Sequence, residues 1–300
     1  MAQGLAGVVS VGRLAVIVNT ADDFELWGLH ISPDLDTVMY TLAGVANPVT
    51  GWGVAGDSHA TLEALNRYGE DIWFSLGDKD LATHILRTQA LGRGESLDQV
   101  TNRLAGALGI STTLLPMTND PVATRIHSGD EILDFQEYFV ARRQQDVVDA
   151  VSFVGIVEGR PAPGVKDALA DATVIVVCPS NPIVSIGPIL ALPGVCNAIQ
   201  ASDAVKIGVS PIIGGKALKG PADRMLTSLG HEASALGVAR IYRDLIDLLV
   251  IDEIDRELVE PIRNLGLEVH VSQTVMGDRQ DRERFARDLL TAAQRLRSHA

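Results

Sequence analysis

The chain has 300 residues, which is enough for one large domain or two closely packed ones. Its 25 basic and 38 acidic residues give a net charge of −13, which argues against broad binding to nucleic acids or anionic membranes. Two cysteines, Cys178 and Cys196, are too few for a disulfide framework or a four-cysteine zinc site, and they favour a reducing cytoplasm. No apolar run reaches about 18 residues, so we expect no membrane span, and the first residues lack the basic segment of a signal peptide.

The first predicted element is a buried parallel strand at residues 13–18, a short apolar run rich in β-branched side chains. The segment 19–37 follows it and is rich in acids. In open α/β sheets, ligands bind beyond the carboxyl ends of the strands, so we expect chemistry here. Ser32 suits the N-cap of a helix and Pro33 its first position. The carboxylates of the segment are Asp22, Asp23, Asp34 and Asp36.

These acids have two interpretations. Aspartate is favoured in turns and in the first turn of helices, so the cluster could serve only capping and solvation. Alternatively, clustered carboxylates repel one another unless a cation neutralises them, and Mg²⁺ carried in with substrate phosphates is the usual partner. The spacing alone leaves both interpretations open.

The next segment predicts two helices joined by a charged turn. Asp57 and Ser58 are placed to cap a helix over 59–69. A second helix follows the Gly-Asp-Lys-Asp turn at 77–80. Its His84 is either a structural residue or part of a site.

Two side chains of this charged turn are candidates for a site. Asp80 and His84 fall four residues apart, on one face of the predicted helix. Lys79 either pairs with a phosphate or balances the two acids that flank it.

Two later strands, 172–178 and 204–209, end in loops that suit an anion. The first leads into Ser180, Asn181 and Ser185, which offer hydroxyls and backbone N–H groups; the alternative is a proline-stiffened turn without a ligand. The second leads into the loop 210–223, which is rich in glycine and lysine and could bind an anion. The alternative interpretation is a flexible surface loop without a ligand. The chain has no Walker A loop and no GxGxxG, so the usual ATP and dinucleotide fingerprints are absent.

Strands and helices alternate along the whole chain, which predicts an α/β fold: a Rossmann-like, doubly wound, mostly parallel sheet with helices on both faces. We expect a single domain over residues 1–300. A helical and irregular insertion for substrate binding is expected around residues 36–145.

Five motifs, in this order, resemble the 2-phospho-L-lactate transferase family: NTADDFELWGLHISPDLDT, LGDKDLATHILRTQ, LPMTNDP, PSNPIVSIGPIL and SPIIGGKALKGPAD. The resemblance covers the chain from about residue 4 to near the C-terminus. It implies a Rossmann-like fold and a step in coenzyme F-420 biosynthesis. Members of the family transfer a phospholactyl or phosphoenolpyruvyl group from a guanosine diphosphate-linked donor to the deazaflavin Fo, with GMP leaving and Mg²⁺ required. A homodimer is also expected from the family.

The resemblance also implies roles for individual residues. Asp34 and Asp36 would lie at the Fo and metal site, one as a metal ligand and the other orienting or deprotonating the acceptor hydroxyl. Lys79, where the family often has arginine, is the third predicted catalytic residue, and Lys79 or Lys216 would offset charge on the leaving GMP. The full set of predicted substrate-binding residues is Asn19, Asp23, Thr37, Asp78, His84, Ser180, Asn181, Ser185, Ser210, Gly214 and Lys216.

The chain departs from the family pattern at its start. The family normally opens with a strand and a Gly-rich loop before the helix that begins this chain. Without that loop we expect weaker binding of the donor, and a start site assigned too far downstream is the explanation that we favour.

Two other functions compete with this one. A non-catalytic regulator of the same fold, which binds a nucleotide-linked sugar, should lack the aspartates after Asn19 and Thr20. A nicotinamide oxidoreductase should carry a GxGxxG, which is absent.

Overall fold

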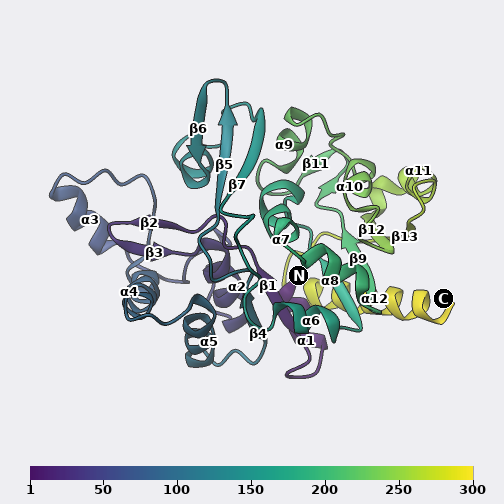
Figure 1. Ribbon diagram of the computed structural model, residues 1–300, viewed down its shortest axis with the longest axis horizontal. Helices are drawn as coiled ribbons and strands as arrows, with labels where there is room; N and C mark the ends of the chain where they lie inside the picture. Colours follow the sequence, from purple (N-terminus) through teal and green to yellow (C-terminus); the bar gives the residue numbers. More distant parts are fainter. Residues whose placement is uncertain (300) are drawn as a thin grey trace. The chain divides into compact units, whose positions relative to one another are not determined.

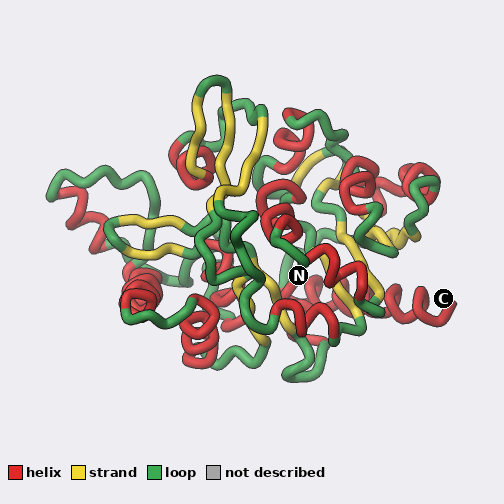
Figure 2. Tube along the Cα trace, viewed as in Figure 1, coloured by secondary structure: helices red, strands yellow, loops and turns green. Residues whose placement is uncertain are grey.

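The computed structural model describes residues 1–299, and the chain divides into two compact units (Figure 1, Figure 2). Unit 1 contains Met1–Ser10, Val147–Val151 and the chain from Gly164 onward. Unit 2 contains Val11–Asp146 and Ser152–Pro163. The expected insertion at 36–145 falls within unit 2, and the single-domain description stays a prediction.

Unit 1 is built on a parallel sheet with the strand order β13-β12-β9-β8. Its strands are β8 (Val174–Val177), β9 (Val205–Val209), β10 (Ile212–Ile213), β11 (Lys216–Ala217), β12 (Leu248–Asp252) and β13 (Glu268–Ser272). Its helices are α1 (Ala2–Val8), α6 (Val165–Ala170), α7 (Gly187–Ala191), α8 (Val195–Ala201), α9 (Ala222–Ser228), α10 (Ala235–Tyr242), α11 (Val259–Arg263) and α12 (Arg279–His299), with the short helical turns η2 (Pro182–Ile186) and η3 (Glu253–Leu258).

The core of unit 1 lies between this sheet and α12. Ile207 and Val250, from the adjacent strands β9 and β12, pack against Phe285 and Leu289 of α12, and all four are inaccessible to solvent. Burial of such side chains stabilises the unit by about 2 kcal/mol each. Helix α1 packs closely on α12, because a Cβ at Gly4 would stand 2.1 Å from the carbonyl oxygen of Arg282.

Unit 2 contains a parallel pair, β1-β4, and antiparallel hairpins. Its strands are β1 (Ala15–Val18), β2 (Phe24–Leu26), β3 (Leu29–Ile31), β4 (Thr113–Pro116), β5 (Ala123–Ser128), β6 (Glu131–Asp134) and β7 (Ala150–Val154), of which β7 crosses the boundary between the units. Its helices are α2 (Pro33–Ala43), α3 (Ala60–Arg67), α4 (Asp78–Gly92) and α5 (Leu97–Ala107), with the π-helical turn η1 (Glu137–Ala141).

The β1-β4 pair is covered by α2 and α5. Val18 and Leu114 from the strands pack against Leu35 and Met39 of α2 and Val100 of α5. The β2-β3 hairpin packs separately, on the start of α4. Two hydrophobic clusters thus place α2 and the β2-β3 hairpin at the end of β1, where the acidic segment lies.

The predicted α/β class with parallel strands is confirmed. The parallel strands belong to separate sheets, β1-β4 in unit 2 and β13-β12-β9-β8 in unit 1. Among the described residues no single helix is long and apolar enough to cross a membrane. The bent pair Pro182–Ala191 and Val195–Ala201, broken by 83°, reaches the required length and composition only when both helices are taken together.

Candidate functional site

Asn19 joins two carboxylates directly beyond the end of β1. Its Nδ2 donates hydrogen bonds to Oδ2 of Asp22 at 2.9 Å and to Oδ2 of Asp34 at 3.1 Å. Its Oδ1 accepts from the backbone N–H of Ala21 at 2.9 Å, which fixes the orientation of the amide. Asn19 and Asp22 are buried, whereas Asp34 is only partly buried. The acidic cluster therefore forms at the strand end that the sequence predicts, and one of its members can be reached from solvent.

Burial and neighbouring carboxylates disfavour the charged forms of the acids in this cluster. Burial raises the pKa of Asp34 to about 6, and the charge of Asp23 adds to this effect, although the bond from Asn19 opposes it. Burial also raises the pKa of Asp22 well above its usual range, with Asp34 as the next cause. Oδ1 of Asp22 and Oδ1 of Asp23 are buried and have no hydrogen-bond partner among the described residues. The cluster thus offers acceptor oxygens, and no basic side chain of the described residues offsets the charges of Asp22 and Asp34.

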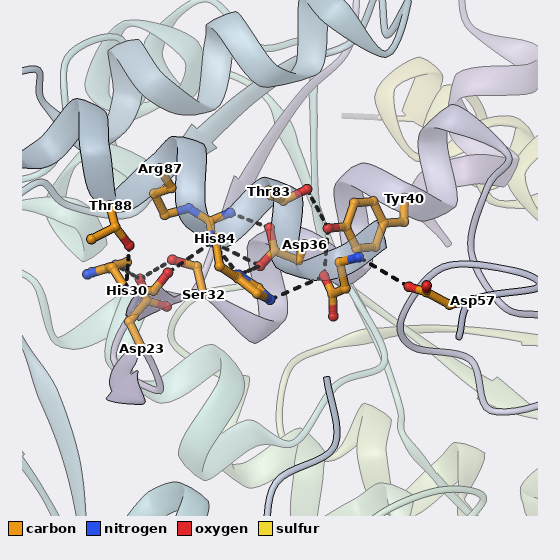
Figure 3. Close-up of polar contacts among 11 residues, drawn as sticks. Asp23, His30, Ser32, Asp36, Tyr40, Asp57, Thr83, His84, Arg87 and Thr88 are labelled. Carbon is orange, nitrogen blue, oxygen red and sulfur yellow. Dashed lines mark hydrogen bonds and ion pairs between the residues drawn. The ribbon is translucent and has the colours of Figure 1, made fainter. Parts of the chain in front are cut away.

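Asp23 is tied to the β2-β3 hairpin (Figure 3). Its Oδ2 accepts a bond of 2.7 Å from the hydroxyl of Ser32 and lies 3.1 Å from Nε2 of His30. Burial raises the pKa of Asp23, whereas His30 and Ser32 act to lower it. As predicted, Ser32 is the N-cap residue and Pro33 begins α2, but the Ser32 hydroxyl bonds Asp23 and does not cap the helix.

Asp36, two residues beyond Asp34, has different surroundings (Figure 3). Both of its oxygens accept from the guanidinium of Arg87, the NH1–Oδ2 distance being 3.0 Å. Asp36 is 4% exposed and Arg87 is 1% exposed, so this is a buried, bidentate ion pair between α2 and α4. Burial acts to lower the pKa of Arg87, but the pairing with Asp36 outweighs it and the pKa is raised.

The polar network continues along α4. Nδ1 of His84 lies 3.3 Å from NH1 of Arg87, and Nε2 lies 3.3 Å from Oδ1 of Asp80. The Tyr40 hydroxyl donates to the same Asp80 oxygen at 2.7 Å. Burial acts to raise the pKa of Asp80, but His84 and Tyr40 outweigh it and the pKa is lowered. The predicted placement of Asp80 and His84 on one helix face is confirmed.

Asp36, Asp80 and His84 offer ligand atoms that lie within 4.8 Å of one another, which is close enough for a metal ion. However, Arg87 already neutralises Asp36 and Tyr40 occupies Asp80. A cation would compete with both contacts, so the arrangement is best described as a compensated structural network, although Nε2 of His84 and Nε of Arg87 have no hydrogen-bond partner among the described residues. The sequence predicts Asp34 and Asp36 at one metal and acceptor site; in the structure the two carboxylates meet different partners, and their catalytic roles remain predictions.

The charged turn before α4 also differs from expectation. The sequence predicts that Asp57 and Ser58 cap α3, but the α3 cap is Asp78, whose carboxylate accepts from the N–H groups of Ala60 and Thr61 at 3.0 Å each. Asp57 caps α4 instead, accepting from the N–H groups of Lys79 at 2.8 Å and Asp80 at 3.1 Å. Chain reversal between the two helices brings their first turns together, so each acid reaches the other helix.

Asp78 and Lys79 therefore have structural partners. The Ser58 hydroxyl, followed by Thr61, lowers the pKa of Asp78. Nζ of Lys79 donates to the carbonyl oxygen of Gly56 at 2.9 Å and to that of Ala55 at 3.4 Å. Thr37 lies half-buried on α2. The predicted roles of Asp78, Lys79 and Thr37 in substrate binding and catalysis remain predictions.

The predicted residues of unit 1 lie on loops at one edge of its sheet. Strands β8 and β9 are parallel neighbours, so the loops that follow them leave at the same edge. After β8, Asn181 caps η2 by accepting from Ile183 N–H at 2.9 Å, and it lies between Ser180 and Ser185.

After β9, the buried Ser210 hydroxyl donates to the carbonyl oxygen of Ile212 at 2.9 Å. Gly214 and the exposed Lys216 follow on a small hairpin. The loops after β8 and β9 are thus brought together as the parallel pattern predicts.

Sequence reasoning missed residues that the structure places in or beside the site. Arg87 follows Asp80 and His84 at the spacing of one helix face, so its position on that face could have been found. Its pairing with Asp36 could not, because the two residues are 51 positions apart. The buried Gln136, which donates to the carbonyl oxygen of Asp22 at 3.2 Å, likewise carries no local signal.

Comparison with known proteins identifies the chain's relatives. A phosphoenolpyruvate transferase from Kitasatospora aureofaciens is 42% identical over 299 residues, covering 98% of this chain and 93% of that protein. A 2-phospho-L-lactate transferase from Methanothermobacter thermautotrophicus is 39% identical over 288 residues, covering 96% of this chain and 92% of that protein.

A solved structure of a UPF0052-family protein from Bacillus halodurans shares the fold, with a TM-score of 0.62 at 16% identity, covering 96% of this chain and 94% of that one. The family model described as 2-phospho-L-lactate transferase CofD matches residues 1–293. The chain therefore belongs to the 2-phospho-L-lactate transferase CofD family, and the prediction of a transferase is confirmed.

Proposed function

We propose that this protein transfers a phospholactyl or phosphoenolpyruvyl group from a guanosine diphosphate-linked donor to the ribityl hydroxyl of the deazaflavin Fo, with release of GMP. The proposal places the protein in coenzyme F-420 biosynthesis. Family membership supports the class of reaction. The observation that carries the proposal is the pair of carboxylates, Asp22 and Asp34, that Asn19 joins beyond the end of β1, where no basic side chain of the described residues offsets their charge.

The donor set of this cluster suits Mg²⁺. Carboxylate oxygens are the ligands that this hard cation prefers, and it commonly binds through one or two carboxylates together with substrate phosphates. The raised pKa values of Asp22 and Asp34 and the unpartnered Oδ1 of Asp22 are what a cation would relieve. We propose that Asp22 and Asp34 hold the ion, which when bound neutralises phosphate charge.

The side chains of the chain itself then have separate tasks. Asn19 orients both carboxylates, and Gln136 holds the backbone of Asp22. The loops after β8 and β9 offer hydroxyls and backbone N–H groups suited to donor phosphates, among them the hydroxyls of Ser180 and Ser185. An O–P bond to the acceptor forms as the O–P bond to GMP breaks, and the proton of the acceptor hydroxyl passes to the departing GMP phosphate or to water. Positioning and charge neutralisation dominate such a transfer.

The function is tested by incubating the protein with Fo, Mg²⁺ and each of three donors: the lactyl, enolpyruvyl and glyceryl forms. With at least one donor, mass spectrometry should detect a phosphodiester that joins Fo to lactate, enolpyruvate or glycerate, together with an equal amount of GMP. Binding of a donor without any transfer would instead favour a non-catalytic regulator that binds a nucleotide-linked sugar.

The variant Asp34→Asn tests the site within this reaction. It should lower the transfer rate by about 10²-fold or more, the usual cost of removing a preorganised electrostatic group. The control Asp130→Asn removes an exposed carboxylate of the same unit and should leave the rate unchanged. Equal rates for the two variants would remove Asp34 from the mechanism. We also propose a cytoplasmic homodimer, and light scattering of the purified protein tests the dimer.

A further inference from the structure

The predicted donor loop after β9 ends in a tight hairpin. Strands β10 and β11 pair through Ile212 with Ala217 and Ile213 with Lys216, which leaves Gly214 and Gly215 as the turn. Their φ angles are +56° and +78°. A two-residue turn with both φ angles positive is the type I′ turn that matches the twist of a hairpin, and glycine adopts it without strain. The hairpin is therefore well defined by its own sequence.

A buried acid from another segment holds the tip of this hairpin. The backbone N–H of Gly214 donates to Asp255 of η3, at 3.0 Å to Oδ1 and 3.2 Å to Oδ2. Asp255 is 3% exposed. It lies three residues beyond the end of β12, which pairs with β9, so the acid and the hairpin follow neighbouring strands. A Cβ at Gly214 would stand 3.3 Å from Cγ2 of Ile254, which shows how closely the two segments approach.

This contact is electrostatically expensive. Burial raises the pKa of Asp255, and the charges of Glu257 and Asp252 add to it, whereas the bond from Gly214 acts to lower it. No arginine or lysine forms an ion pair with Asp255 among the described residues. A Gly-Gly turn does not need a buried anion in order to form, so stability of the turn alone does not account for Asp255. A role in fixing the position of the turn accounts for the buried acid.

We propose that Asp255 is a positioning residue, which holds the Gly214–Gly215 turn and the adjoining Lys216 where they receive the diphosphate of the donor. The inference rests on the proposed function, because it takes the donor to be a nucleoside diphosphate derivative. Gly215 and Lys216 are exposed beyond the clamped Gly214. A fixed turn presents its N–H groups to an anion without the entropy cost of ordering a loop.

The test compares Asp255→Ala with Asp255→Asn. Alanine removes the acceptor of the Gly214 N–H, whereas the asparagine side-chain oxygen can still accept it. Asp255→Ala should weaken GDP binding, measured by calorimetry, by about tenfold, and should raise the KM for the donor but not the KM for Fo. Asp255→Asn should stay within about threefold of wild type. The control Asp203→Ala truncates an exposed aspartate of the same unit and should change neither quantity.

Hydrogen exchange gives a readout that does not depend on nucleotide. Amides of the hairpin at 212–217 should exchange faster in Asp255→Ala than in wild type or Asp203→Ala. Unchanged exchange together with unchanged GDP affinity in Asp255→Ala would overturn the proposal. An Asp255→Asn variant as impaired as Asp255→Ala would also overturn it, because the charge of Asp255 and not its hydrogen bond to Gly214 would then matter. If wild type binds no GDP, the proposed donor fails, and with it the role of the clamp in donor binding.

Gly214→Ala keeps Asp255 but strains the turn, since alanine disfavours a φ of +56°. It should reproduce the loss of GDP affinity seen in Asp255→Ala. A Gly214→Ala protein with wild-type affinity would also overturn the proposal.

Discussion

Asp34 and Asp36 lie two residues apart at the start of one helix, yet their surroundings differ completely. Side chains two positions apart on an α-helix point about 200° away from each other, so the two carboxylates face opposite sides. Asp36 meets the guanidinium of Arg87, whereas Asp34 meets the amide of Asn19 and a second carboxylate, Asp22. One acid is neutralised within the fold. The other belongs to a cluster that is completed only by a ligand.

The contrast separates structural acids from functional ones. A buried ion pair contributes little net stability, but it costs heavily when one partner is removed. A buried acid without an opposite charge beside it is itself a cost to the fold, and natural proteins usually keep such a cost where function requires it. The pair Asp22 and Asp34 fits the second description, and Asp36 the first.

The largest effect expected from this comparison follows removal of Arg87. Arg87→Met leaves the Asp36 carboxylate buried without its guanidinium partner and with only His84 Nδ1 nearby, at 3.6 Å. The substitution should lower the free energy of unfolding by about 3–5 kcal/mol in urea denaturation. Arg93→Met, at the exposed end of the same helix, should change it by less than about 0.5 kcal/mol. Combining Arg87→Met with Asp36→Leu should restore part of the loss. Equal stability of the two single variants would show that Arg87 is not needed to neutralise Asp36.

A smaller effect concerns the pH dependence caused by Asp34. Its folded pKa of about 6 lies above the usual value of 3.8, so between these values the folded chain holds the proton more tightly than the unfolded chain. The stability of wild type relative to Asp34→Asn should therefore be highest below about pH 4 and fall by about 2 kcal/mol as the pH rises through about 6.

Thermal unfolding of both proteins across this range, in the presence of a chelator, measures the difference. Added Mg²⁺ should stabilise wild type above about pH 6 and have little effect on the variant, because binding requires the ionised carboxylates. A pH-independent difference between the two proteins would contradict the assignment of a raised pKa to Asp34.

The smallest effect concerns the helix caps that support the compensated network. Asp57→Ala removes the acceptor for the first N–H groups of α4, and should lower the free energy of unfolding by about 1 kcal/mol. Asp57→Asn keeps an acceptor oxygen and should lose less. Chemical denaturation of the two variants decides this, and an alanine variant as stable as wild type would show that Asp57 is not an effective cap.

Much of the fold could be predicted from local patterns. The strand at 13–18, the helix that begins at Pro33 and the parallel strands of the second half follow from apolar runs and capping residues. The loops after β8 and β9 could be grouped because parallel strands end at the same edge of a sheet.

Long-range partners could not be predicted in the same way. From the sequence alone, the aspartates at 22, 34 and 36 cannot be told apart as structural or functional residues. Only packing decides that Arg87 pairs with Asp36 and not with Asp34. The caps show the same limit, since Asp57 stands directly before α3 but its carboxylate turns to α4. Capping preferences correctly identify Asp57 as a helix cap, but they assign it to α3 and not to α4.

The exchange of caps between Asp57 and Asp78 couples two events that are separate along the chain. Asp57, which precedes α3, caps α4, and Asp78, which begins α4, caps α3. Neither first turn is therefore capped until the segment between the two acids has folded back. Closing that loop once orders both turns. Fraying at the beginning of α3 should therefore spread to the beginning of α4, and from there to the Asp80–His84 contact, so that local unfolding in this region is cooperative across more than twenty residues of sequence.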